Sequence, residues 1–171
     1  MKKTVILFLI LSLGLSVFAQ QEKAKTEANY LIGFSKLLSW NNYSDNLFVI
    51  NCVGGTDVMD FINARAINIK TGGKKIIARE TTIDNLYNCN ILFIAEDKIS
   101  ELQNIIENPL SNNILVVTDM KNTIQQGADV SFEYSKISTT DSLLSYRINL
   151  QSIRNKNIKI APEFIGYGIN E

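Results

Sequence analysis

The apolar positions of the chain fall into two patterns, and their alternation predicts the fold. Short continuous runs rich in Val and Ile are typical of strands buried on both faces of a sheet, whereas apolar residues at helical spacing indicate amphipathic helices. The runs predict strands at residues 47–53, 90–95 and 114–118, with a further strand at 75–79. Helical spacing predicts helices at residues 24–40, 56–66, 97–107 and 150–155, and a helical turn at 82–87.

The order of these elements predicts the fold class. Apolar strands separated by helices indicate right-handed βαβ units and a mainly parallel sheet. Residues 128–134 and 143–149 are strand-like stretches around a polar loop, 135–141, and predict an antiparallel hairpin that extends the sheet. We therefore expect a single three-layer α/β domain with a mixed, mainly parallel sheet of about five or six strands and a C-terminal antiparallel hairpin.

The first helix of this domain is expected to bury one face only. Apolar residues between Tyr30 and Leu38 recur at helical spacing, which places Lys25, Glu27 and Lys36 on its other faces.

Residues 1–19 carry the pattern of a secretory signal peptide. Lys2 and Lys3 precede an apolar run at 4–17, and Val17 and Ala19 occupy the small-residue positions before Gln20. An uncleaved anchor is the alternative, but the run is shorter than the ~20 residues that span a membrane. We expect cleavage after Ala19, which leaves residues 20–171 as a periplasmic domain that is no longer embedded in the membrane.

Charge and composition argue against two functional classes. The chain has 17 basic and 17 acidic residues, and loss of Lys2 and Lys3 leaves a formal net charge of −2 without a basic stripe, so nucleic acid is not an expected partner. The chain has no histidine, which removes the commonest general base and the usual zinc sites. We expect no enzymatic activity, no metal and no cofactor.

The chain has two cysteines, Cys52 and Cys89. An even number in an exported protein favours a disulfide, and two buried free thiols are the alternative.

Three places in the chain could contact a ligand or partner. Gly54 ends a strand before a helix, where backbone amides could hold an anion, although a tight turn is the favoured interpretation. Glu96 and Asp119 follow two apolar strands, at the edge where parallel sheets bind ligands, and with Asp97 they could hold a cation. Helix capping by Asp97 and turn formation by Asp119 are the favoured interpretation of these acids. Trp40 ends the first helix and is either a contact residue or part of the core.

Six segments in a fixed order carry a resemblance to a known family. They cover residues 30–40 (YLIGFSKLLSW), 48–54 (FVINCVG), 86–94 (LYNCNILFI), 114–119 (ILVVTD), 127–132 (GADVSF) and 146–150 (YRINL). Together they resemble the opening helix, the first strand and the later strands of the YfiR-like family of periplasmic regulators.

This resemblance implies a function as well as a fold. The best-known YfiR-like proteins are not enzymes; they bind the periplasmic sensor part of an inner-membrane diguanylate cyclase and repress it, which controls cyclic di-GMP. The matching cysteines of such members form a disulfide, so the resemblance favours a Cys52–Cys89 bond. The alternative function is that of a periplasmic small-molecule-binding protein, with its ligand in a crevice near Gly54, Glu96 and Asp119. A homodimer is left open by the sequence.

Overall fold

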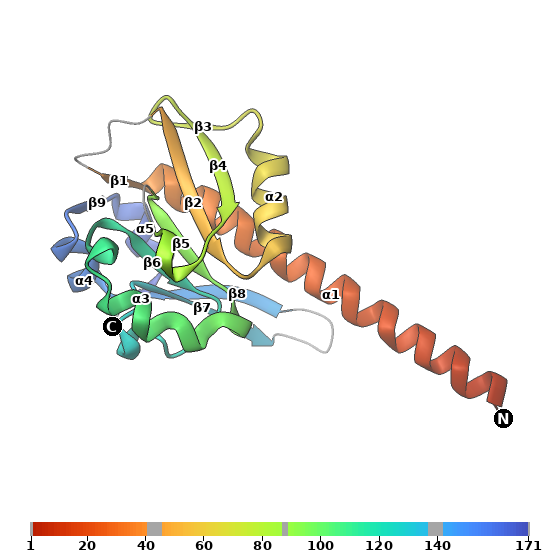
Figure 1. The fold of residues 1–171 in the computed structure, drawn as a ribbon. Helices are drawn as coiled ribbons and strands as arrows, with labels where there is room; N and C mark the ends of the chain where they lie inside the picture. The colour runs from red at the N-terminus through yellow and green to blue at the C-terminus, as the bar shows by residue number, and fades with distance from the viewer. Residues whose placement is uncertain (1, 41–45, 87–88, 137–141, 171) are drawn as a thin grey trace.

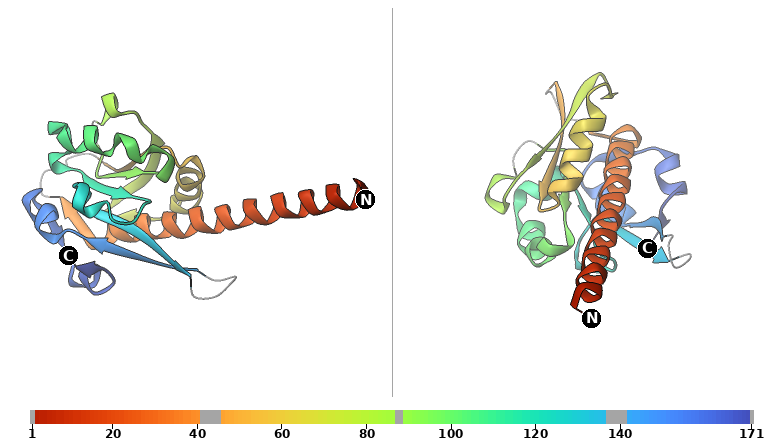
Figure 2. Two further views of the ribbon diagram at one scale, coloured as in Figure 1. Left: turned by 90° about the horizontal axis from the view of Figure 1, so that it is seen from below. Right: turned by 90° about the vertical axis from the view of Figure 1, so that its right-hand side faces the viewer.

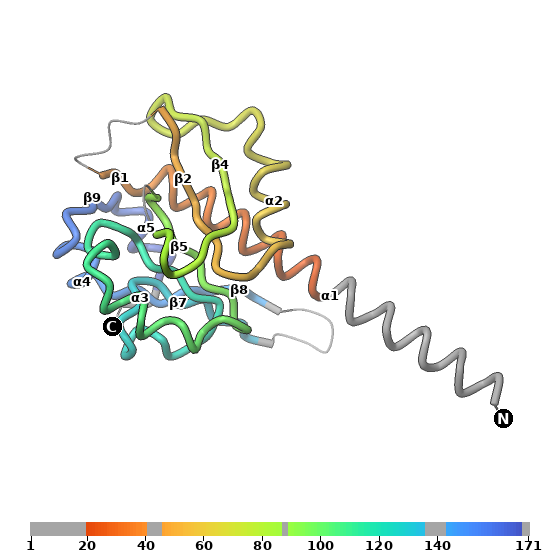
Figure 3. Tube along the Cα trace, viewed as in Figure 1, coloured from red at the N-terminus to blue at the C-terminus, as the bar shows by residue number. Residues whose placement is uncertain are grey.

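The structure is a computed structural model that describes the backbone of residues 2–40, 46–86, 89–136 and 142–170. Side chains are described for residues 20–40, 46–86, 89–135 and 143–168 (Figure 3). The predicted cleavage site and the apolar run before it therefore lie outside the described side chains, and the signal peptide stays a prediction. Among the described residues, no helix is long and apolar enough to cross a membrane.

Helices and strands alternate along most of the chain (Figure 1). The helices are α1 (Lys2–Leu37), α2 (Thr56–Ala66), α3 (Leu102–Glu107), α4 (Leu150–Asn155) and α5 (Pro162–Gly166). The strands are β1 (Leu38–Trp40), β2 (Leu47–Val53), β3 (Lys70–Thr71), β4 (Lys74–Glu80), β5 (Ile91–Ile94), β6 (Leu115–Thr118), β7 (Val130–Lys136), β8 (Ser142–Ile148), β9 (Ile158–Ile160) and β10 (Ile169–Asn170).

The strands form one large mixed sheet and one small antiparallel pair. The large sheet has eight strands in the order β10-β8-β7-β6-β5-β2-β4-β3, and its central pairs from β4 to β7 are parallel. β7 and β8 form the predicted antiparallel hairpin, in which Val130 lies opposite Ile148. β3 and β4 form a second hairpin around Gly72 and Gly73. The mixed, mainly parallel sheet of the prediction is confirmed, with more strands than expected.

Side chains of the sheet alternate between two hydrophobic clusters, one on each face. In β2, Phe48, Ile50 and Cys52 belong to the larger cluster, while Val49 and Val53 belong to the smaller one. Helices α1, α2 and α5 contribute to the larger cluster and α3 to the smaller one, so the predicted three layers are present. Figures 1 and 2 show α1 and α2 side by side across the same face of the sheet.

The first predicted helix ends earlier than expected. α1 ends at Leu37, and Leu38–Trp40 form β1, which pairs with β9 so that Leu38 lies opposite Ile160 and Trp40 opposite Ile158. The Leu37 carbonyl accepts a hydrogen bond from the Ala161 amide at 2.9 Å. The prediction of helix to Trp40 was wrong because this pairing partner lies at the far end of the chain and leaves no trace in local periodicity.

The helix predicted at 97–107 also differs in how it begins. The helix expected at 97–107 begins as a 3-10 helix over Glu96–Glu101 and becomes α-helical only in α3. Helix α2 has the predicted bounds, and its N-cap is Gly55. The left-handed conformation of Gly55, with φ 64°, makes the sharp turn from strand to helix.

Candidate functional site

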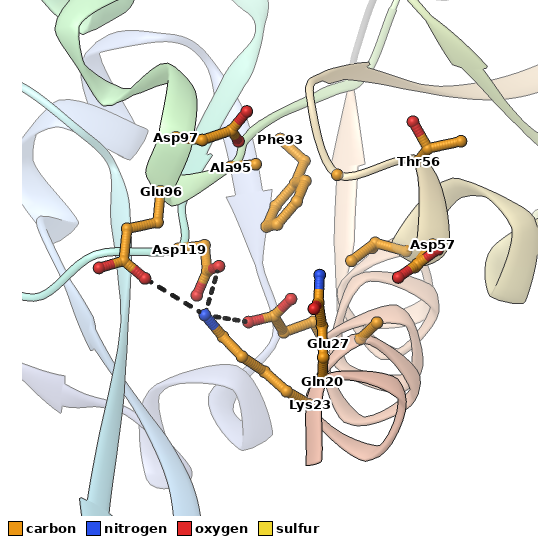
Figure 4. Close-up of a pocket in the computed structure, with 13 residues that line it drawn as sticks. Gln20, Lys23, Glu27, Thr56, Asp57, Phe93, Ala95, Glu96, Asp97 and Asp119 are labelled. Carbon is orange, nitrogen blue, oxygen red and sulfur yellow. Dashed lines mark ion pairs between the residues drawn. The ribbon is translucent and has the colours of Figure 1, made fainter. Parts of the chain in front are cut away.

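A crevice opens at the carboxyl ends of the central parallel strands. It lies between α1, the turn from β2 to α2, and the residues that follow β5 and β6, with a volume of about 630 Å³ (Figure 4). Ligands of open α/β sheets bind at this edge, where the loops after neighbouring strands separate. We call it the acidic crevice, because its charged lining residues are Glu27, Asp57, Glu96, Asp97, Asp119 and Lys23.

Lys23 of α1 joins the acidic groups at the centre of this crevice. Its Nζ lies 2.7 Å from Asp119 Oδ2, 3.5 Å from Glu96 Oε2 and 3.9 Å from Glu27 Oε1. The same nitrogen lies 5.2 Å from the centre of the Tyr134 ring, within the range of a cation–π interaction. Burial opposes the charge on Lys23, but the hydrogen bond and charge of Asp119 outweigh it and raise the Lys23 pKa.

Glu27 is buried beside this lysine, with a side chain only 2% exposed. Burial and the neighbouring Asp119 carboxylate raise the Glu27 pKa from 4.5 to about 9, so Glu27 carries a proton at neutral pH. The Tyr134 hydroxyl donates a hydrogen bond of 2.8 Å to Glu27 Oε1. Burial and the charge of Glu27 raise the pKa of Tyr134 as well, which keeps this hydroxyl a donor.

Asp119 is incompletely satisfied at the same place. Its residue is 9% exposed, and its Oδ1 atom is buried without a hydrogen-bond partner among the described residues. A buried carboxylate oxygen without a partner is uncommon in folded proteins, because its lost hydration is not replaced. The protonated Glu27 carboxyl beside Asp119 can donate this hydrogen bond, and the contact is one of the causes that raise the Glu27 pKa.

The turn between β2 and α2 contributes Gly55 to one wall of the crevice. Gly54 and Gly55 both have positive φ, and a Cβ on Gly55 would lie 2.9 Å from Cε1 of Phe93. Gly55 lines the acidic crevice, whereas Gly54 lines a second crevice beside Thr81 and Lys98. The sequence-predicted Glu96 and Asp119 are thus brought together in one site, and Gly54 lies just outside it.

Trp40 lies away from the acidic crevice. Its ring packs edge-on against Phe48 at the start of β2, with 5.3 Å between ring centres, and its Nε1 donates a hydrogen bond of 3.0 Å to the Asn113 carbonyl. It lines a separate groove with Ser39 and Thr71. The structure does not bring Trp40 together with the other predicted site residues.

Cys52 and Cys89 are free and buried in the structure, so the expected disulfide is not formed in it. The two side chains belong to the hydrophobic clusters on opposite faces of the sheet. Side chains alternate between the two faces along β2, and this alternation places Cys52 on the face opposite to Cys89. The number of cysteines in the sequence does not contain this information. Burial is the largest cause that raises both thiol pKa values to about 12, which keeps them protonated.

Three residues of the site were missed by the sequence interpretation, namely Lys23, Glu27 and Tyr134. Glu27 was expected on an outer face of its helix but is buried, because that face of α1 lies against the ends of β6 and β7. The spacing of Lys23 and Glu27, four residues apart on one helix, was the available signal. Within the described part of the chain, no group of three or more Asp, Glu or Cys side chains could hold a metal ion.

Comparisons with known proteins address the chain as a whole. A model of the YfiR/HmsC-like family matches residues 24–166. Among solved structures, the fold resembles the crystal structure of a conserved domain protein from Vibrio cholerae, with a TM-score of 0.57 and 11% sequence identity over 84% of this chain. The match covers 59% of that protein, and at this identity it concerns the fold alone. No curated protein matches the chain. The family match extends over most of the domain, and the protein therefore belongs to the YfiR/HmsC-like family.

Proposed function

We propose that this protein is an exported regulator that acts by binding a partner. The observation that carries the proposal is the family match over residues 24–166, which agrees with the resemblance carried by the sequence motifs. In this proposal, cleavage after Ala19 releases residues 20–171 into the periplasm. The domain then binds the periplasmic sensor part of an inner-membrane signalling protein, a diguanylate cyclase, and represses it.

The proposal is for a binding protein without catalysis of its own. The described lining of the acidic crevice holds carboxyl groups, one lysine and one threonine, and it contains no serine, cysteine or histidine. Regulation by a protein of this kind must come from a difference in its affinity for two states of the partner.

Loss of the protein tests the regulatory proposal most directly. We expect deletion of its gene to raise cellular cyclic di-GMP, measured by mass spectrometry of nucleotide extracts, and a plasmid copy to restore the lower level. Pull-down of detergent-solubilised membranes with the purified mature domain should recover a protein with a periplasmic sensor and a cytoplasmic cyclase domain. An unchanged nucleotide level together with recovery of a different membrane protein would replace the proposed partner.

The role of the cysteines is a separate question within this proposal. The resemblance implies a disulfide, whereas the structure holds Cys52 and Cys89 as free thiols. Alkylation of the non-reduced protein in denaturant, followed by mass spectrometry, distinguishes the two: two alkylated cysteines support the structure and none supports a redox-sensitive bond. Redox control of partner binding stays in the proposal only in the second case.

A second candidate function is favoured by the crevice itself. A volume of about 630 Å³ at the carboxyl edge of a parallel sheet is the size and place of a small-molecule site. In this second proposal, the crevice binds a small ligand, and a screen of ligands by thermal shift should identify at least one that stabilises the protein.

A further inference from the structure

The proposed cleavage after Ala19 makes Gln20 the first residue of the mature protein. Gln20 is the first residue whose side chain the structure describes, and it lies on α1, where it lines the acidic crevice (Figure 4). Before cleavage its backbone nitrogen is part of a peptide bond within a helix that runs from Lys2 to Leu37. Cleavage turns that nitrogen into a free α-amino group, which then stands on the same residue as a side-chain amide.

The structure leaves Gln20 free to move after cleavage. The residue is exposed, and its side-chain amide makes no hydrogen bond or ion pair with the described part of the chain. In an uninterrupted helix its backbone N–H donates to the carbonyl four residues earlier, and cleavage removes that carbonyl. Neither the amine nor the side chain of Gln20 is then held by the rest of the domain.

The helix becomes fixed to the domain only a few residues later. Lys23 Nζ lies 2.7 Å from Asp119 Oδ2, and Ala24 is 5% exposed and belongs to the larger hydrophobic cluster. Gln21 and Glu22 are exposed like Gln20, so the mature chain has a free tip of three residues in front of this anchor. Terminal residues of this kind fray at almost no cost in free energy.

We propose that Gln20 is a modification site, at which the mature N-terminus closes into a pyroglutamyl ring. The α-amino nitrogen attacks the Cδ carbonyl carbon of the same side chain, and a new N–Cδ bond forms. The bond from Cδ to the side-chain nitrogen breaks, and that nitrogen leaves as ammonia with a hydrogen from the α-amine. The step consumes no oxidant, reductant or cofactor. The modification rests on the proposed export and cleavage, because Gln20 has no free amine in the uncleaved chain.

Two properties of Gln20 make this reaction available at neutral pH. An α-amine loses its proton far more readily than a lysine side chain, so part of it is an uncharged nucleophile. The reacting atoms belong to one residue, so they meet without the entropic cost of bringing two molecules together. Gln21 carries the same side chain and is also exposed, but its nitrogen stays in a peptide bond, which makes it a matched control.

Ring closure would protect the anchor of α1 from trimming. Aminopeptidases remove residues one at a time from a free α-amine, and the loss of four residues from Gln20 onward would delete Lys23, the partner of Asp119. The closed ring has no free amine and no terminal positive charge. The mature protein therefore keeps its short tip, and with it the Lys23–Asp119 pair.

The intact mass of the reduced protein, purified from the periplasm of cells that express the full chain, tests the modification. We expect the mass of residues 20–171 less one molecule of ammonia, and an N-terminus that Edman degradation cannot open. Gln21→Ala should show the same loss of ammonia, whereas Gln20→Ala should show none. Aminopeptidase digestion should shorten Gln20→Ala and leave the wild type and Gln21→Ala intact. Circular dichroism of each variant verifies folding.

A second preparation measures the reaction in the folded domain. A fusion protein cut directly before Gln20 supplies the domain with an open amine, and mass spectrometry follows the loss of ammonia at neutral pH. We expect a rate within about threefold of that of a peptide with the sequence of residues 20–27, because the tip frays at almost no cost. A rate lower by more than about tenfold would show that the folded domain holds Gln20, and would overturn the inference.

The outcomes separate the modification from the export on which it rests. A periplasmic protein that begins at Gln20 with its full mass would overturn the modification and leave export standing. A periplasmic protein that begins at another residue would overturn the modification as well, because Gln20 would carry no free amine. A protein that keeps residues 1–19 and stays in the cytoplasm would overturn both, whereas the loss of ammonia from residues 20–171 supports both.

Discussion

Among the described residues, two lysine–aspartate pairs have a buried aspartate, and they differ in how many hydrogen bonds that aspartate accepts. Under α4, Lys156 Nζ lies 2.6 Å from Asp129 Oδ2 and donates to the Ile114 carbonyl at 3.0 Å. Asp129 also accepts from the Val116 amide at 2.7 Å and from Ser152 Oγ at 2.6 Å. In the acidic crevice, Lys23 and Asp119 form a pair of similar length, but Asp119 Oδ1 has no partner among the described residues.

The difference lies in how firmly each aspartate is held. The Asp129 side chain is fully buried, and its three recorded hydrogen bonds, from Val116, Ser152 and Lys156, join β6 and α4 to the start of β7. A complete buried network rigidifies a core, because every group that lost water has found a replacement. The Lys23–Asp119 pair is open to solvent on the lysine side, and its aspartate lies beside the protonated Glu27 rather than among backbone and hydroxyl donors.

The largest effect should come from breaking the complete pair. We expect Asp129→Asn to lower the free energy of unfolding by about 3–5 kcal/mol, because Lys156 is left as a buried charge without a counter-ion. Asp119→Asn should cost only about 1 kcal/mol, since Lys23 is one-third exposed and keeps Glu96 nearby. Urea denaturation of the two variants at pH 7 makes the comparison. Equal losses in the free energy of unfolding would mean that the two pairs contribute equally to stability.

The second effect depends on pH and belongs to the crevice alone. The folded pKa of Glu27, about 9, lies above its ordinary value of 4.5, so its contribution to stability is complete below pH 4.5 and is lost as the pH rises through 9. Glu27→Gln mimics the protonated side chain and should remove this loss. Near pH 9.5 we expect the variant to exceed wild type by at least about 1.4 kcal/mol, the equivalent of one pKa unit.

Denaturation between pH 5 and pH 9.5 measures the difference in slope. Glu163→Gln is a suitable control, because Glu163 is an exposed carboxylate that lies outside both buried pairs. A wild-type curve parallel to that of Glu27→Gln would show that Glu27 is ionised throughout.

The third effect is smaller and comes from removing one hydroxyl group beside each lysine–aspartate pair. Ser152→Ala deletes a donor to the ionised, fully buried Asp129 and should cost about 2 kcal/mol. Tyr134→Phe deletes the donor to Glu27, which is neutral at pH 7, and should cost about 1 kcal/mol. Thermal and urea unfolding at pH 7 test the order. A larger loss of stability in Tyr134→Phe than in Ser152→Ala would indicate that Glu27 is ionised at pH 7.

The smallest effect is expected at the rim of the crevice. Glu96 is 66% exposed and its Oε2 lies 3.5 Å from Lys23, so solvent screens most of the attraction. Glu96→Gln should change the free energy of unfolding by less than about 0.5 kcal/mol. A larger loss in denaturant titrations would show that the carboxylates hold Lys23 as one cooperative network.

The sequence predicts the residues that follow the strands of the acidic crevice better than those contributed by α1 and β7, for a physical reason. Strands β2, β5 and β6 were predicted because a continuous apolar run is a local property, and the rule for parallel sheets then brought Glu96 and Asp119 to one edge. Lys23, Glu27 and Tyr134 join them only because α1 crosses the end of β7. The direction of that crossing depends on tertiary packing, and local periodicity does not contain it.

The same limit applies to both ends of the domain. β1 and β9 are each three residues long, too short for a recognisable pattern, and each is a strand only because the other is present. Trp40 was placed in a helix for this reason. The facing of Cys52 and Cys89 is likewise set by the sheet as a whole rather than by the spacing of the two cysteines.

The packing of the first elements of the domain against its last elements has a consequence for the order of synthesis, export and folding. The helix that opens the domain packs against its last elements: Phe34 meets Phe164 at 5.0 Å between ring centres, and Tyr30 donates to the Leu144 carbonyl. Contacts between distant parts of a chain form slowly, because the long intervening loop must close first. A nascent chain that lacks residues 144–164 therefore lacks part of the surface against which α1 packs and cannot complete its core. Under the proposed export route, the polypeptide stays translocation-competent until its final segment has been synthesised, and folding is completed on the far side of the membrane.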